Sequence, residues 1–145
     1  MLIRRFQYSD LSRVYEIECM CFSDPYDISI LLKLFELGVG FFVAEENDLV
    51  VGYVLFSINA DCEGHIISIA VDKNYRGVKV GSTLLESVLS IFMQTGLERV
   101  VLEVKTHNIK AIRFYESFGF VIDCKEFEYY EDGSDAYIMY LDFPS

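Results

Sequence analysis

The chain has 145 residues, its composition is 52% hydrophobic and 15% aromatic, and its formal net charge is −11. Length and composition predict one domain over residues 1–145 with a packed core. The negative charge disfavours a nucleic acid partner and favours a cationic one, such as a protonated amine. A membrane partner is not expected either, because the apolar stretch 28–44 is interrupted by Lys33, Glu36 and two glycines.

Cysteine and histidine residues do not indicate a metal site. The four cysteines lack zinc-type spacing, and neither His65 nor His107 has a second ligand at metal spacing. For both histidines, a solvated or core side chain is favoured over a metal ligand or a catalytic group. The first ten residues lack the apolar segment of a signal peptide. We therefore expect no metal, reduced cysteines and a cytoplasmic protein.

Hydrophobic periodicity and turn residues predict the secondary structure. The predicted elements are, in chain order, strand 2–7, helix 11–21, helix 27–37, strands 41–46, 49–58 and 62–71, a long helix from Thr83 to just before Gly96, strand 99–105, helix 109–118, and strands 120–129 and 135–141. Thr83 and Glu86 have the spacing of a capping box at the start of the long helix. This order predicts an α/β fold with a mixed sheet of about seven strands and about four helices.

The turn between strand 62–71 and the long helix is the clearest functional signal. It contains the segment Arg76-Gly77-Val78-Lys79-Val80-Gly81. A glycine turn between a buried strand and a helix can bind phosphate, because the first N–H groups of the helix and its dipole favour an anion. The segment matches neither a Walker loop nor the G-x-G-x-x-G fingerprint. It predicts a phosphate-carrying cofactor, and the alternative is a plain chain reversal with cations for solubility.

Glu103 is a candidate general base. Strand alternation places it on one face with Arg99, Val101 and Lys105. Apolar surroundings would raise the pKa of its carboxyl group, and a base near neutrality suits proton removal from an amine with a pKa of about 8. The alternative is an edge-strand glutamate paired with Arg99 or Lys105.

Asn108 and Tyr115 are seven residues apart, so they lie on one face of helix 109–118. A tyrosine can donate a proton to a thiolate, and an asparagine can bond to the amide groups of a ligand. The alternative is a helix cap and a core aromatic ring beside Phe114 and Phe118.

Three segments together resemble one family. Arg76 to Gly81 is similar to the pyrophosphate loop of GNAT superfamily acetyltransferases, with Lys79 at the position of the usual middle glycine. Residues 102–120, from Leu-Glu-Val-Lys to Phe-Tyr-Glu-Ser-Phe-Gly-Phe, resemble the signature of RimI-like protein N-terminal acetyltransferases. Residues 129–139 resemble the terminal hairpin of the same group. The order of elements also resembles the GNAT acyl-CoA N-acyltransferase fold over nearly the whole chain.

The resemblance implies transfer of acetyl from acetyl-CoA to the α-amino group of a protein N-terminus. A ribosomal protein is one such substrate, and an auxiliary subunit can take part. Glu103 would be the general base and Tyr115 the proton donor. The implied cofactor contacts are Ile69, Ala70 and Val71 through the backbone, Arg76, Gly77, Val78, Lys79, Val80, Gly81 and Ser82 at the pyrophosphate, and Asn108 at the pantetheine. The implied peptide contacts are Phe22, Pro25, Tyr26, Tyr129 and Tyr130.

Lys79 is the one departure from the family loop, and two other functions stay open. We expect Lys79 to adopt ordinary helical dihedral angles, with its side chain directed outward. One alternative function is acetylation of a small amine or a lysine side chain, against which the tyrosine-rich hairpin argues. The other is a non-catalytic CoA-binding or partner-binding domain with a degraded loop, against which the presence of both Glu103 and Tyr115 argues.

Overall fold

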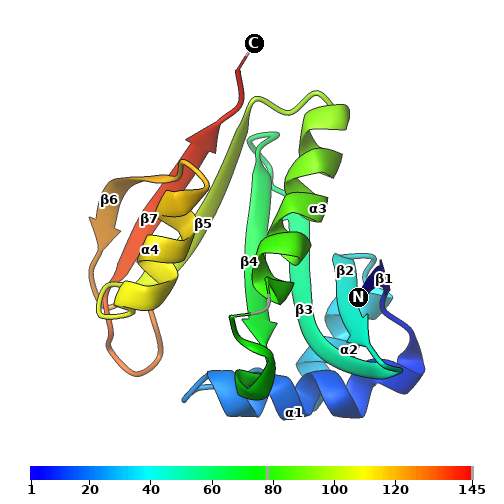
Figure 1. Ribbon diagram of the computed structural model, residues 1–145. Helices are drawn as coiled ribbons and strands as arrows, with labels where there is room; N and C mark the ends of the chain where they lie inside the picture. Colours follow the sequence, from blue (N-terminus) through cyan, green and yellow to red (C-terminus); the bar gives the residue numbers. More distant parts are fainter. Residues whose placement is uncertain (78, 145) are drawn as a thin grey trace. The chain divides into compact units, whose positions relative to one another are not determined.

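A computed structural model describes residues 1–77 and 79–144 of the chain (Figure 1). Its helices and strands are β1 (Leu2–Arg5), α1 (Leu11–Cys21), α2 (Ile28–Glu36), β2 (Gly40–Glu46), β3 (Leu49–Ile58), β4 (Gly64–Val71), α3 (Val80–Gln94), β5 (Arg99–Lys105), α4 (Ile109–Ser117), β6 (Val121–Glu126) and β7 (Ala136–Asp142). The hydrogen-bonded strand order is β1-β2-β3-β4-β5-β7-β6. The predicted mixed sheet of seven strands with four helices is confirmed.

The chain forms two compact units, which are described separately. Unit 1 consists of Met1–Ser57 and Ile67–Ile91, and unit 2 consists of Ile58–Ile66 and Phe92–Ser145. The boundary passes through β4 and through α3, so each unit contains part of both elements.

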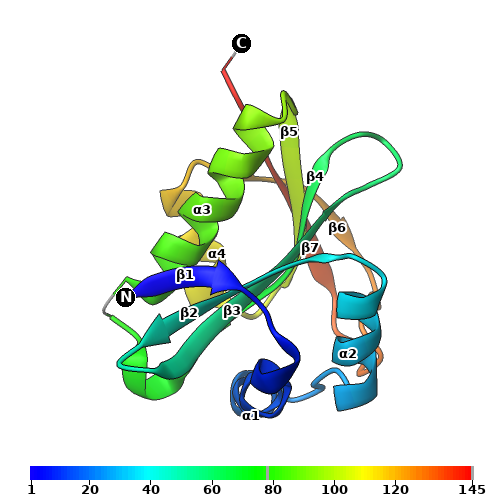
Figure 2. The same ribbon diagram turned by 90° about the vertical axis from the view of Figure 1, so that its right-hand side faces the viewer.

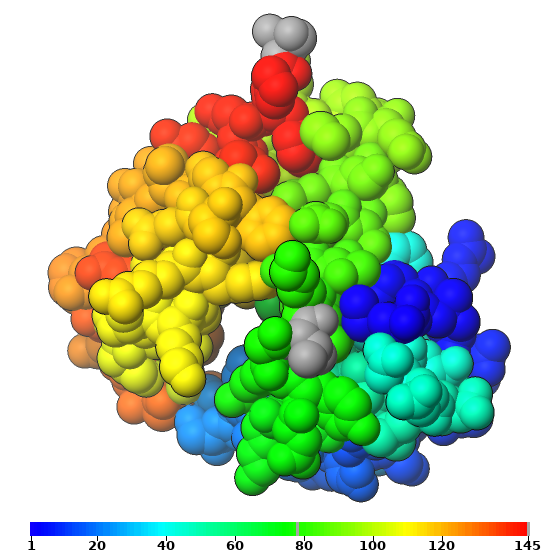
Figure 3. Space-filling view, in the orientation of Figure 1, coloured from blue at the N-terminus to red at the C-terminus, as the bar shows by residue number. Residues whose placement is uncertain are grey.

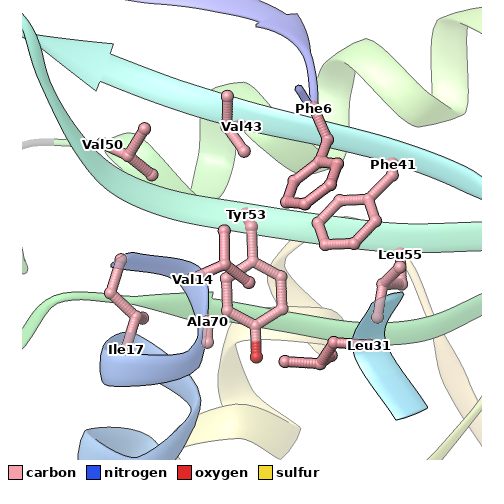
Figure 4. Close-up of a cluster of buried hydrophobic side chains, with 10 residues drawn as sticks. All are labelled: Phe6, Val14, Ile17, Leu31, Phe41, Val43, Val50, Tyr53, Leu55 and Ala70. Atoms are coloured by element: carbon pink, nitrogen blue, oxygen red, sulfur yellow. The ribbon is translucent and has the colours of Figure 1, made fainter. Parts of the chain in front are cut away.

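In unit 1, helices cover both faces of the strands, as Figure 2 shows. Strand β2 pairs antiparallel with β1 and with β3, and successive β3 residues point to opposite faces. On one face a Cβ at Gly52 would lie 3.0 Å from Val80 and 3.2 Å from Leu84, so α3 packs closely there. On the other face the Tyr53 ring extends into a buried cluster with α1 and α2 (Figure 4). The cluster contains Phe6, Val14, Ile17, Leu31, Phe41, Val43, Val50, Tyr53, Leu55 and Ala70.

In unit 2, β5 pairs with strands on both sides. The first three residues of β4 run parallel to it, from Gly64 opposite Val100 to Ile66 opposite Leu102. Strand β7 runs antiparallel to β5 and also pairs with β6. The even-numbered residues of β5 are buried, while Glu103 and the other odd-numbered residues are half-buried. The predicted face of Glu103 is therefore confirmed.

The strands predicted over 2–7 and 62–71 are each two residues shorter in the structure, and two other predicted boundaries are wrong by three residues. Helix α3 begins at Val80, and Thr83 is no cap, because its hydroxyl and its N–H both donate to the Lys79 carbonyl, at 2.8 and 3.0 Å. Strand β6 ends at Glu126, because the chain turns at Glu128, where φ is +51° and the N–H donates to Asp135. Among the residues described, no helix has the length and apolar character needed to cross a membrane.

Candidate active site

In unit 1, the turn that follows β4 is fixed to the neighbouring elements through Asp72. This side chain is 3% exposed and accepts hydrogen bonds from the Asn74 N–H and the Arg13 guanidinium. The Asp72 N–H donates to the Val51 carbonyl at 2.8 Å. These contacts hold the backbone at the point where the chain leaves β4, a few residues before Arg76 and Gly77.

The first turn of α3 presents backbone donors next to two cations. Val80, Gly81 and Ser82 are the first three helical residues, so their N–H groups have no acceptor within the helix. The Arg76 and Lys79 side chains are exposed, and the segment that follows β4 lies at the surface in the view of Figure 3. This arrangement suits a pyrophosphate, because the helix N–H groups, the helix dipole and the two cations all favour negative charge. The predicted contact Val78 lies outside the described residues.

The predicted dihedral angles of Lys79 are wrong. Its φ is +65°, in the left-handed region, and Gly77 two residues earlier has φ +87°. The positive φ lets the chain turn into α3 while the Lys79 carbonyl accepts the first helical hydrogen bond, from Thr83 at 3.0 Å. Lys79 thus has the backbone conformation that favours the family's glycine, which a side chain with a Cβ adopts only at an energetic cost.

Lys79→Gly is expected to raise the free energy of unfolding by about 0–1.5 kcal/mol, since relief of the left-handed backbone outweighs the extra entropy of the unfolded chain. Lys79→Val should lower it by about 1 kcal/mol or more, because a β-branched residue tolerates positive φ poorly. Urea unfolding measures both. The matched control is Arg76→Gly, at φ −69°, which should destabilise. A Lys79→Gly variant as unstable as this control would contradict the role of strain.

The same variants test cofactor binding. Lys79→Gly should leave the affinity for acetyl-CoA within a few-fold of the parent, because one exposed charge contributes about 0.3–1 kcal/mol and is screened by salt. Arg76→Ala should weaken binding more. Calorimetric titration with CoA compares them. Tightening by about tenfold or more in Lys79→Gly would mean that the lysine side chain obstructs the loop.

In unit 2, Glu103 is paired with His65. The His65 Nε2 lies 2.8 Å from Oε1 and 3.1 Å from Oε2 of Glu103, and both side chains are partly buried. In the tautomer that carries its proton on Nε2, His65 donates to the Glu103 carboxylate. Of the two predicted alternative partners, Arg99 pairs with Asp142 and Lys105 with Asp132. His65 is the functional candidate that the sequence analysis missed.

Tyr115 is a buried residue whose hydroxyl group is affected by the charge of Glu103. Its side chain is 8% exposed, and its ring packs edge-on against Phe114 and Phe120. Burial chiefly raises the pKa of Tyr115, and the neighbouring Tyr130 and Glu103 raise it further. The phenol therefore keeps its proton throughout the neutral pH range, as a proton donor must.

Asn108 caps α4, as the alternative interpretation predicted. Its Oδ1 accepts the Ala111 N–H at 3.2 Å, and the residue is exposed. Since the amide oxygen serves the cap, the side-chain NH2 is the group that could donate to a ligand carbonyl.

The predicted peptide contacts of unit 2 lie in the β6–β7 loop and not in a strand. Tyr129 is half-exposed, and its ring meets the Tyr130 ring edge-on with centroids 5.0 Å apart. The Tyr130 N–H and carbonyl bond to Ser134 and Gly133, which closes the loop. Burial chiefly raises the pKa of Tyr129, and the charge of Glu103 contributes. The charge of Glu103 therefore raises the pKa of both Tyr115 and Tyr129.

The remaining predicted contacts belong to unit 1. Ile69, Ala70 and Val71 are the last residues of β4, and the Val71 carbonyl accepts the Cys21 thiol at 3.2 Å. Phe22, Pro25 and Tyr26 lie in the connection between α1 and α2, where Pro25 and Tyr26 are exposed.

Fold and side chains together define an acetyltransferase, and comparison with known proteins agrees. The model of the acetyltransferase (GNAT) family matches residues 11–120, so the chain belongs to this family and is an acetyl-CoA-dependent N-acetyltransferase. It is 40% identical over 141 residues to an uncharacterized N-acetyltransferase of Methanocaldococcus jannaschii, covering 96% of this chain and 90% of that protein. It is 34% identical over 150 residues to the N-alpha-acetyltransferase of Sulfolobus acidocaldarius, covering 94% and 89%.

A solved structure supports the same assignment. The ribosomal-protein-S18-alanine N-acetyltransferase of Escherichia coli matches with a TM-score of 0.88 and 28% identity over 99% of this chain and 94% of that one. The GNAT fold and the RimI-like character expected from the sequence are confirmed.

Proposed function

We propose that the protein transfers acetyl from acetyl-CoA to the α-amino group of a protein N-terminus, with the whole chain acting as one acetyltransferase domain. The observation that supports this most is the Glu103 carboxylate, held at 2.8 Å by His65 and coupled electrostatically to Tyr115 and Tyr129. The names of the Sulfolobus acidocaldarius and Escherichia coli relatives point to the same class of acceptor.

In this proposal unit 1 binds the cofactor. The N–H groups of Val80, Gly81 and Ser82 donate to the pyrophosphate, and Arg76 and Lys79 neutralise its charge. Gly77 provides the turn, and the backbone of Ile69, Ala70 and Val71 aligns the pantetheine. The Asn108 amide, which belongs to unit 2, is a separate candidate contact of the pantetheine. Acetyl-CoA supplies the acetyl thioester.

Glu103 and Tyr115 move the protons. Glu103, directly or through a water, takes the proton from the ammonium group, and the freed nitrogen forms a bond to the acetyl carbon while the carbon–sulfur bond breaks. Tyr115 gives its phenolic proton to the departing sulfur, and the second proton that the acylated nitrogen loses restores the phenol. His65 holds the Glu103 carboxylate by donating from Nε2, which orients the carboxylate before the reaction.

The candidate peptide contacts are Phe22, Pro25 and Tyr26 in unit 1 and, separately, Tyr129 and Tyr130 in unit 2. The β6–β7 loop also carries Glu128, Glu131, Asp132 and Asp135, whose charge favours a cationic amine. A ribosomal protein is one candidate substrate, an auxiliary subunit can take part, and the reaction takes place in the cytoplasm.

A peptide library identifies the acceptor. The purified chain is incubated with acetyl-CoA and peptides that differ in the first two residues, alongside polyamines and lysine peptides with blocked N-termini, and mass spectrometry locates the acetyl group. Acetylation of free N-termini is the expected result. Acetylation of lysine or polyamines alone would favour the alternative acceptors, and CoA binding without turnover would indicate a non-catalytic domain.

A further inference from the structure

One buried residue bonds to both ends of the loop formed by residues 22–26. Glu18 lies in the last part of α1 and is 2% exposed. Its backbone carbonyl accepts the Phe22 N–H at 3.0 Å, and its side-chain Oε2 accepts the Tyr26 N–H at 3.0 Å. The loop therefore begins and ends on hydrogen bonds to the same residue.

The second oxygen of this carboxylate is held from β3. Glu18 Oε1 accepts the hydroxyl of Tyr53, a fully buried residue of β3. Each oxygen of Glu18 thus has one donor, and every group that holds it belongs to unit 1. The loop is connected through this carboxylate to β3.

Stability alone does not account for a carboxylate at this position. Burial chiefly raises the pKa of Glu18, since a charge removed from water is costly. The surrounding cluster is apolar, and replacing a buried polar pair by apolar side chains of similar volume is often neutral or stabilising. What an apolar pair cannot supply is an acceptor for the Tyr26 N–H, in a segment whose side chains are exposed.

We propose that Glu18 is a positioning residue for substrate, which holds the 22–26 loop in the conformation that receives the peptide N-terminus. This rests on the proposed function, because that function assigns Phe22, Pro25 and Tyr26 to the acceptor. Glu18 does not contact the reacting atoms; it acts through the Tyr26 backbone. Its loss should weaken peptide binding and leave cofactor binding intact.

The test compares three variants with the parent chain. Glu18→Leu with Tyr53→Phe removes the whole polar pair and keeps apolar volume, which guards against unfolding. Glu18→Gln keeps an amide oxygen able to accept the Tyr26 N–H, so it serves as the conservative variant. Glu16→Leu is the matched control, since Glu16 lies in the same helix with a side chain that is 64% exposed. Thermal unfolding confirms that each variant is folded.

Two readouts are expected to move in the double variant. Hydrogen exchange at the Tyr26 amide should accelerate by about tenfold or more, because the amide loses its acceptor. The KM for an N-terminal peptide should rise by about tenfold or more, with the larger part of the kcat/KM loss in KM and the Kd of CoA within about twofold. Glu18→Gln should fall closer to the parent than to the double variant in both readouts, and Glu16→Leu should match the parent.

Three results would overturn the inference: unchanged Tyr26 exchange in the double variant, unchanged peptide KM, or an equal KM rise in Glu16→Leu. If the parent acetylates lysine side chains but no N-terminal peptide, the proposed function fails by itself. The same variants are then compared on the lysine peptide, and an unchanged KM there removes the positioning role of Glu18.

Discussion

Glu103→Gln is expected to lower kcat by about 100-fold or more while the fold and the affinity for acetyl-CoA stay intact. The amide is nearly isosteric and its oxygen can still accept the His65 Nε2 proton, which lies 2.8 Å from Oε1 in the parent. The variant therefore removes the basicity of the group and keeps its hydrogen bond. The measurement is steady-state kinetics with an N-terminal peptide over a range of pH.

The matched control is Arg99→Gln, on the same face of β5, where the guanidinium pairs with Asp142. Its kcat should stay within about twofold of the parent, because this surface ion pair contributes little. A pH–rate profile of Glu103→Gln identical to that of the parent would remove Glu103 from proton transfer. The imidazole of His65 would then be the next group to substitute.

Tyr115→Phe should lower kcat by about 10–100-fold with little change in the KM of either substrate. The phenol's interaction strengthens only as negative charge develops on sulfur, so its loss affects the transition state more than the bound substrates. Phenylalanine keeps the edge-on contacts with Phe114 and Phe120, so the core of unit 2 should remain packed.

Single-turnover kinetics separates this effect from product release. Tyr140→Phe is the control, since Tyr140 is a tyrosine of the same unit whose ring lies under Arg99. Its rate should equal that of the parent. A Tyr115→Phe variant that raises KM and leaves the single-turnover rate unchanged would reassign Tyr115 to substrate binding.

His65 illustrates why a site residue can be missed. Its sequence neighbourhood is that of any strand residue, and it lies 38 positions from Glu103. The two side chains meet because β4 runs parallel to β5 with His65 opposite Val101. Register between strands this far apart depends on how both pack, which no local pattern reports. Lys79 is a comparable case, because nothing in its side chain indicates a φ of +65°.

The sequence by itself determined the order of elements, the face of Glu103 and the position of the glycine turn before α3, and it offered the cap at Asn108 as one of two interpretations. These follow from short-range periodicity and from the chemistry of helix ends, which act over a few residues. Only the tertiary structure decided that His65 holds Glu103 and that Glu18 holds Tyr26, as well as the start of α3 and the backbone of Lys79. The two side-chain contacts join groups that no periodic pattern pairs, and the free-energy cost of leaving a buried donor or acceptor unpaired favours them.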